Sequence, residues 1–166
     1  MAYRILGLPR AGFAPYFGRS AEELEEMGAR RVIADADRGF PCRVSLEDAA
    51  RGEALILLNF TSHDVSGPYR SAYAIYVRER AAQAQAYVDR LPPVFAGRTL
   101  SLRGFDAPGM LRRARLAAQG EAGAPLGGVE EAIAELFADP TIACIHAHNA
   151  AYGCFAARIE RHGDDR

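Results

Sequence analysis

The stretch that decides the fold is IACIHAHNAAYGCFAARIER, which runs from Ile142 to Arg161. Side chains alternate between the two faces of a β-strand. Apolar side chains occupy every second position of this stretch before the segment NAAYG, and they do so again after it. The pattern therefore predicts a C-terminal β-hairpin with strands over residues 142–148 and 154–161, each with one apolar and one more polar face.

The pairing of these two strands follows from their faces. We expect His148 to pair with Cys154. His146 then lies opposite Ala156, and both apolar faces fall on one side, under a helix predicted over residues 129–137. A slip of one residue would expose the apolar set, so the register is well specified. The polar side collects Cys144, His146, His148, Cys154, Arg158 and Glu160.

This polar side has three interpretations. It is a half-solvated sheet face or a polar layer whose hydrogen bonds are satisfied. Alternatively, His146, His148 and Cys154 bind Zn²⁺ or Fe²⁺ with one position open, although their spacing matches no standard zinc signature. The third interpretation is a thiol-imidazole catalyst, in which His148 activates Cys154 and Asn149 orients the pair. The sequence leaves all three open.

Outside the hairpin, strands dominate and many connections are short. The alternation of side chains predicts strands over residues 3–8, 31–36, 54–58, 72–78, 100–103 and 110–117. Helices are predicted over residues 81–88 and 129–137 and from a capping box at Ser20 to Gly28. We therefore predict an α+β fold with a mainly antiparallel sheet packed by a few helices. Residues 1–166 are expected to form one domain, with 161–166 as a frayed tail.

The basic residues exclude several kinds of chemistry. All 20 of them are arginine, in a chain of 166 residues. Without lysine there is no Schiff-base lysine, no pyridoxal phosphate anchor and no phosphate-loop lysine, so no P-loop nucleotide site is expected. Any charged contact with an anionic ligand must come from arginine.

The net charge of −1 gives no field that would attract nucleic acid or an anionic membrane surface. No stretch reaches the roughly 18 apolar residues of a membrane span, and the N-terminal segment is broken too early for a signal peptide. We expect a cytoplasmic protein with no nucleic-acid or membrane partner and with a small molecule as the ligand to consider. The oligomeric state stays open.

Four more residues are candidates for ligand binding. Cys42 next to Arg43 is either a reactive thiol beside a cation or a packed thiol. Arg70 could hold an anion, or it is a surface arginine, and Arg158 lies on the polar side of the hairpin. By contrast, His63 falls in a polar loop predicted over residues 61–70 and is expected to be solvated.

Several short motifs resemble one family along nearly the whole chain. The motifs are FPCRVSL (40–46), GE (52–53), PYRS (68–71), IYVR (75–78), FDA (105–107), IHAHNA (145–150) and GCFAAR (153–158). Together they resemble the bacterial domain-of-unknown-function family numbered 1203. The resemblance implies a stand-alone bacterial protein of about this length, and it brings no activity, cofactor or catalytic residue. Residues 119–128 resemble the family pattern least.

The resulting functional hypothesis is a small-molecule enzyme or binding protein with a His/Cys site on the hairpin, which would include a metal if the second interpretation holds. The site would use His146, His148 and Cys154. Cys42 and Arg43 would join it only if their strand neighbours the hairpin. The alternative is a non-catalytic structural or interaction module in which the histidines and cysteines are packed.

Overall fold

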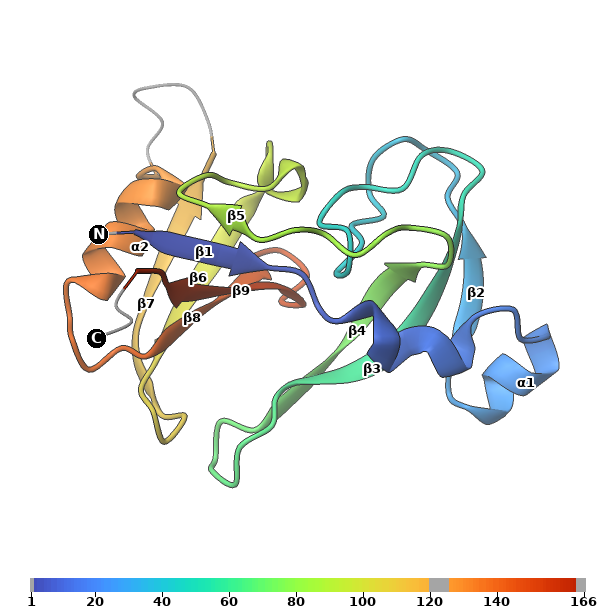
Figure 1. Cartoon of the computed structure of the whole chain (residues 1–166), viewed down its shortest axis with the longest axis horizontal. Helices are drawn as coiled ribbons and strands as arrows, with labels where there is room; N and C mark the ends of the chain where they lie inside the picture. Colours follow the sequence, from blue (N-terminus) through green and yellow to red (C-terminus); the bar gives the residue numbers. More distant parts are fainter. Residues whose placement is uncertain (1, 120–125, 164–166) are drawn as a thin grey trace.

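Two antiparallel sheets form the framework of the computed structural model, which describes residues 2–119 and 126–163 (Figure 1). The six-stranded sheet has the order β5 (Tyr87–Val88), β1 (Tyr3–Leu6), β9 (Phe155–Arg161), β8 (Cys144–Asn149), β6 (Thr99–Phe105) and β7 (Leu111–Ala118). The three-stranded sheet has the order β2 (Arg30–Ile33), β3 (Ala54–His63) and β4 (Ser71–Arg78). The predicted α+β fold with a mainly antiparallel sheet and a C-terminal hairpin is confirmed.

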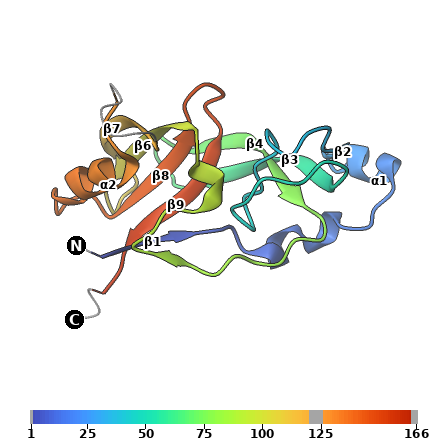
Figure 2. The same cartoon turned by 90° about the horizontal axis from the view of Figure 1, so that it is seen from above.

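The two sheets lie side by side along the long axis, with a helix at each end of the molecule (Figures 1 and 2). Helix α1 (Ala21–Glu26) begins at the predicted capping box, in which Ser20 Oγ accepts from Glu23 N at 3.1 Å and Glu23 accepts from Ser20 N at 2.7 Å. Helix α2 (Val129–Phe137) has the predicted bounds. Two short 3₁₀ helices are η1 (Arg10–Tyr16) and η2 (Pro93–Phe95).

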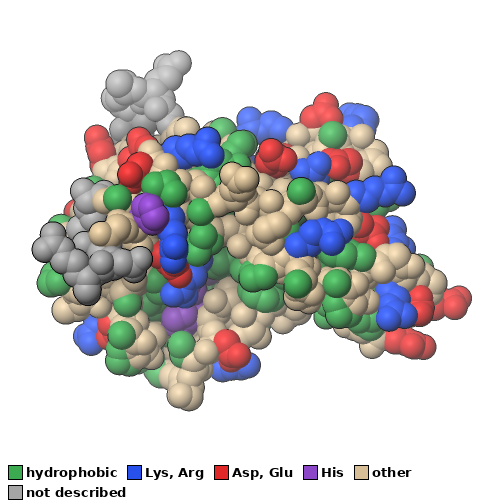
Figure 3. All heavy atoms as spheres, in the orientation of Figure 1, with side chains coloured by type: hydrophobic (Ala, Val, Ile, Leu, Met, Phe, Trp, Pro, Cys, Tyr) green, Lys and Arg blue, Asp and Glu red, His purple; other side chains and the backbone are tan. Residues whose placement is uncertain are grey.

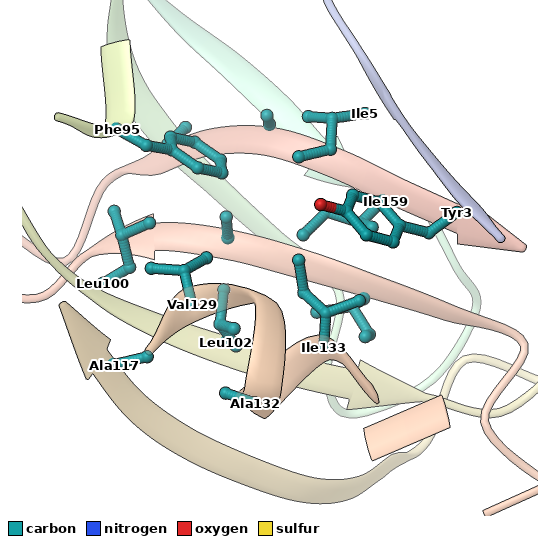
Figure 4. Close-up of a cluster of buried hydrophobic side chains, with 14 of the residues drawn as sticks. Tyr3, Ile5, Phe95, Leu100, Leu102, Ala117, Val129, Ala132, Ile133 and Ile159 are labelled. Carbon is teal, nitrogen blue, oxygen red and sulfur yellow. The ribbon is translucent and has the colours of Figure 1, made fainter. Parts of the chain in front are cut away.

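Helix α2 covers the apolar side of the hairpin, as predicted. Its stripe of Val129, Ile133, Leu136 and Phe137 is buried in one cluster with side chains of β8, β9, β6 and β1. Figure 4 shows Val129 and Ile133 of this stripe in that cluster. A second cluster lies under the three-stranded sheet, where Phe13 of η1 and Leu24 of α1 pack on Ile56, Ile75 and Val77. Each sheet therefore has its own covered apolar face.

The register of the hairpin differs from the prediction. His146 pairs with Arg158 and His148 with Phe155, with a β-bulge between these pairs, so the predicted pairing of His148 with Cys154 is wrong. The bulge places both Ala156 and Ala157 in the core under α2. It also turns Phe155 to the polar side, where its ring packs edge-on against the His148 ring at 5.9 Å between centroids.

The predicted helix over residues 81–88 is also wrong. Residues 81–86 have no regular structure, and residues 87–88 form β5. The guanidinium of Arg10 donates to Ala81 O at 2.9 Å, and Ala84 N donates to Val44 O at 3.1 Å. Because these backbone groups are bonded to distant segments, they are not free for the helical pattern. Tertiary contacts override the local helix propensity here.

The predicted frayed tail is partly ordered structure. Arg161 belongs to β9, and its guanidinium donates to the carbonyls of Phe137 and Ile142 at 2.9 and 3.2 Å. His162 N donates to Ala2 O at 3.0 Å. Residues 164–166 of that tail, and residues 120–125 of the loop over 119–128, lie outside the described residues.

Charges of both signs are interspersed on the face shown in Figure 3. Ion pairs in the described chain include Arg31 with Glu79 at 2.8 Å and Arg98 with Asp48 at 2.7 Å. Such mixing gives this face no field of a single sign. None of the described helices has the length and apolar character that crossing a bilayer requires.

A close approach at Gly7 gives the first prediction. Just after β1, Leu8 N donates to Arg43 O at 2.7 Å, and a Cβ on Gly7 would lie 2.3 Å from Val44 O. Gly7→Ala therefore forces two backbones apart, and we expect the free energy of unfolding to fall by about 1–3 kcal/mol in urea titrations. The matched control is Gly12→Ala, where a Cβ meets nothing within 4 Å. Equal stabilities of the two variants would contradict this account.

Candidate functional site

A cavity of about 590 Å³ lies where the two sheets meet the turn of the C-terminal hairpin. The three-stranded sheet contributes side chains of β3 and β4, and the six-stranded sheet contributes the turn between β8 and β9. The segment between β2 and β3 closes a further side. The lining residues are Gly39, Pro41, Arg43, Leu57, Tyr73, Ala74, Tyr76, Arg98, Thr99, Asn149, Ala150, Ala151, Tyr152 and Cys154.

Arg43 is a buried cation in the wall of this cavity, with 2% of its surface exposed. Its guanidinium donates from Nε to Phe155 O at 2.8 Å, from Nη1 to Pro41 O at 2.5 Å and from Nη2 to Cys154 Sγ at 3.1 Å. Within residues 2–119 and 126–163, no carboxylate forms an ion pair with it. Burial lowers the pKa of Arg43, and the charge of Cys154 opposes that shift.

Cys154 presents its sulfur to the cavity between two donors. Besides Arg43 Nη2, the sulfur accepts from Nδ2 of Asn149 at 3.4 Å. The side chain of Asn149 is buried, and its Oδ1 has no hydrogen-bond partner among the described atoms. The amide is therefore oriented with its donor, rather than its acceptor, toward the sulfur. Because hydrogen bonds to an ionised acceptor are the stronger ones, this arrangement suits a thiolate.

The hairpin turn holds Cys154 in this position. Asn149 N donates to Cys154 O at 3.0 Å, and Gly153 N donates to Asn149 O at 2.7 Å. Gly153 has a φ of 73°, in the left-handed region that glycine adopts at little cost. His148 donates from Nδ1 to Gly153 O at 2.9 Å. The residue before Cys154 is thus held at both its amide and its carbonyl.

Behind the cavity, three histidine rings pack between the two sheets. The ring of His146 lies edge-on to His63 at 5.0 Å and to Phe155 at 5.3 Å between centroids. The ring of His148 meets Tyr73 at 5.0 Å. All three histidines are buried. We call His63, His146 and His148 the histidine layer.

His146 and His148 are uncharged at neutral pH. Burial is the main cause that lowers the pKa of His146 to about 3, and the neighbouring His63 adds to it. Burial likewise lowers the pKa of His148 to about 4. Both nitrogens of His146 are buried without a hydrogen-bond partner in the described structure, so an imidazolium there would be an unpaired buried charge.

The three predicted metal ligands do not converge. The hydrogen bonds of Cys154 Sγ run to Arg43 and Asn149, whereas Nδ1 of His148 bonds to a backbone carbonyl. In the part of the chain that the structure describes, no group of three or more His, Cys, Asp or Glu side chains could hold a metal ion. Of the predicted thiol-imidazole set, Cys154 and Asn149 are in contact. Within the described residues, His148 forms no hydrogen bond with the thiol of Cys154.

Of the four predicted ligand-binding residues, only Arg43 lines the cavity. Cys42 is fully buried elsewhere, where its sulfur accepts from three backbone amides. Arg70 is largely exposed and pairs with Asp64 at 3.0 Å. Arg158 lies opposite His146 and pairs with Glu160 at 2.8 Å.

Sequence reasoning missed the role of His63. It is buried rather than solvated, because β3 continues to His63 where a polar loop was predicted. Its Nε2 lies 2.9 Å from Gly109 O, and its ring stacks near Phe105 at 4.1 Å between centroids. The β-prone pair Phe60 and Thr61 was the signal that the strand extends beyond residue 58.

The lowered pKa values of His146 and His148 predict acid sensitivity. Since the pKa values of His146 and His148 are about 3 and 4 in the folded chain, against about 6.5 in an unfolded chain, the unfolded chain binds more protons below pH 6.5. The free energy of unfolding is therefore unaffected by these two histidines above pH 6.5, and it falls as the pH drops toward 4. At pH 5 each of the two histidines lowers the free energy of unfolding by about 2 kcal/mol.

The measurement is urea unfolding at pH 7 and pH 5 for the wild type and His146→Phe. The phenylalanine keeps an aromatic ring in the layer and removes the proton-binding site. We expect the loss of stability between the two pH values to be about 2 kcal/mol smaller in the variant. An unchanged loss would show that His146 is not a source of the acid sensitivity.

Comparisons with known proteins add the family. No curated protein and no solved structure matches the chain. The family model described as "Protein of unknown function (DUF1203)" matches residues 39–161. That range contains every lining residue of the cavity and the whole histidine layer. The chain therefore belongs to the DUF1203 family of proteins of unknown function.

Proposed function

We propose that the protein is a small-molecule enzyme that uses the thiolate of Cys154 as its nucleophile. The observation that carries this proposal is the contact of 3.1 Å between Nη2 of Arg43 and Sγ of Cys154 in the wall of a cavity. The sequence suggested an imidazole as the partner of this thiol. The guanidinium of Arg43 takes that place in the proposal.

The charge of Arg43 supports the ionised form of the thiol. A cation that is removed from water costs several kcal/mol unless it is paired. Neutral carbonyls accept two of the hydrogen bonds of Arg43, and Cys154 is the ionisable group that accepts the third. A thiolate would neutralise the buried charge, and a cation beside a thiol favours the thiolate. Asn149 contributes a second donor to the same sulfur.

The lining of the cavity indicates the class of ligand. Apolar side chains such as Leu57 and Ala74 lie beside Tyr73, Tyr76 and Tyr152. Among the described residues, neither Asp nor Glu lines the cavity, so no acidic side chain faces a ligand there. The cavity is therefore suited to a neutral or anionic organic molecule, with the aromatic rings as contact surface.

In this proposal the histidines act as positioning residues. His148 bonds to the carbonyl of Gly153, directly before the nucleophile. Phe155, whose carbonyl accepts from Arg43, packs edge-on against the rings of His146 and His148. The packed rings of His146 and His148 thus support both the cation and the thiol without taking part in proton transfer.

Alkylation of the folded protein by iodoacetamide at pH 7 tests the proposal. A free thiol is only a few per cent thiolate at this pH, so we expect Cys154 to react about tenfold faster than glutathione. Peptide mass spectrometry assigns the modified residue. Cys42 and Cys144 are buried, so they should stay unmodified until the protein is unfolded.

Three variants assign the effect to the cation. Arg43→Met should remove the rate advantage, and Arg43→Lys should keep part of it because the charge remains. Arg70→Met is the matched control, since Arg70 is exposed and does not line the cavity. Circular dichroism establishes that each variant is folded. If Cys154 in the folded wild type reacts no faster than glutathione, the proposal is wrong and packed thiols in a non-catalytic module account for the site.

A further inference from the structure

We propose that the substrate of Cys154 is an organic hydroperoxide, an inference that rests on the proposed thiolate function. The protein would reduce the hydroperoxide to an alcohol and form a sulfenic acid on Cys154. Three features of the cavity support this class of substrate. They are the lack of a carboxylate or an imidazole in the lining, the N–H groups of Arg43 that make no hydrogen bond within the described residues, and the apolar walls.

The first feature concerns proton transfer. Within the described chain, the lining residues include no carboxylate and no imidazole. Acyl transfer through a cysteine needs a base to activate the water that releases the product. Oxidation of a thiolate by a hydroperoxide needs no base, because the nucleophile is already ionised. The ionisable side chains of the lining are arginines, tyrosines and Cys154, a set that suits the second reaction better than the first.

The second feature is the hydrogen-bonding capacity of Arg43. A guanidinium has five N–H groups, and three of them donate to Phe155 O, Pro41 O and Cys154 Sγ. The other two have no partner among the described residues. Arg43 lines the cavity, and in this proposal these two donors bind the substrate. A pair of donors next to a thiolate suits the two linked oxygens of a hydroperoxide.

In the proposed step, the thiolate of Cys154 attacks the terminal oxygen of the hydroperoxide. The S–O bond forms, and the O–O bond breaks. Its electron pair leaves with the alkoxide, which takes a proton from water to give the alcohol. The sulfur is oxidised and the hydroperoxide is reduced. The unused N–H groups of Arg43 would stabilise the negative charge that develops on the leaving oxygen.

The third feature selects the organic part of the substrate. Hydrogen peroxide would leave a cavity of about 590 Å³ mostly filled with water. Leu57, Tyr73, Tyr76 and Tyr152 offer apolar surface to an alkyl or aryl group. Burying such a group adds binding free energy that hydrogen peroxide lacks.

The other cysteines lie away from the sulfenic acid. Neither Cys42 nor Cys144 lines the cavity, and both are buried. We therefore assign the reduction to an external low-molecular-weight thiol. One thiol condenses with the sulfenic acid to a mixed disulfide and water, and a second releases the Cys154 thiol and a disulfide of the reductant.

The experiment mixes reduced wild-type protein with cumene hydroperoxide or with hydrogen peroxide at pH 7 and traps the sulfenic acid with dimedone. Peptide mass spectrometry measures the rate at Cys154. We expect oxidation by cumene hydroperoxide to be about 100-fold faster than that of glutathione, and about tenfold faster than oxidation of Cys154 by hydrogen peroxide. Arg43→Met should lower the first rate about 100-fold, and Arg70→Met should leave it unchanged.

The outcomes separate this inference from the function on which it rests. Rapid alkylation by iodoacetamide with oxidation at the rate of glutathione would overturn the hydroperoxide assignment and leave the nucleophilic thiolate in place. Slow alkylation together with slow oxidation would overturn both. Equal rates with the two peroxides would overturn the assignment to organic hydroperoxides. These readings use the wild type, so they do not depend on whether Arg43→Met folds.

Discussion

The buried guanidinium of Arg43 is the constraint on which the arrangement of the two sheets around the cavity depends. Its side chain bonds to the backbone and the sulfur at the start of β9, at Phe155 and Cys154. Its backbone accepts from Leu8 N at 2.7 Å and donates to Tyr76 O at 3.1 Å. One residue therefore joins the end of β1, the edge strand β4 and the C-terminal hairpin. A change at this position affects the fold and the site together.

The histidine layer fills the space behind this junction as aromatic surface. His63 comes from the three-stranded sheet, and His146 comes from the six-stranded sheet. Neutral imidazoles can pack against Phe105 and Phe155 in a way that imidazolium ions cannot, because a charge there would have no partner. The layer is thus compatible with a catalytic thiol only if the histidines do not serve as its base.

Local periodicity predicted what depends on neighbours in the sequence. The capping box at Ser20 and the helix over residues 129–137 are of this kind. The register of the hairpin could not be predicted, because Ala156 and Ala157 are both small and apolar and either can face the core. The contact between Arg43 and Cys154 joins residues 111 positions apart, and no repeating pattern signals such a pair.

The bulge in β9 changes the parity of the strand. Before it, an odd-numbered residue, Phe155, faces the histidine layer, and after it the odd-numbered Ala157 and Ile159 face helix α2. The start of β9 therefore belongs to the site, and the rest of the strand packs against α2. Substitutions at Phe155 can change the packing of the histidine layer without altering the surface that α2 covers. Specificity and stability can thus diverge independently within a family that keeps this bulge.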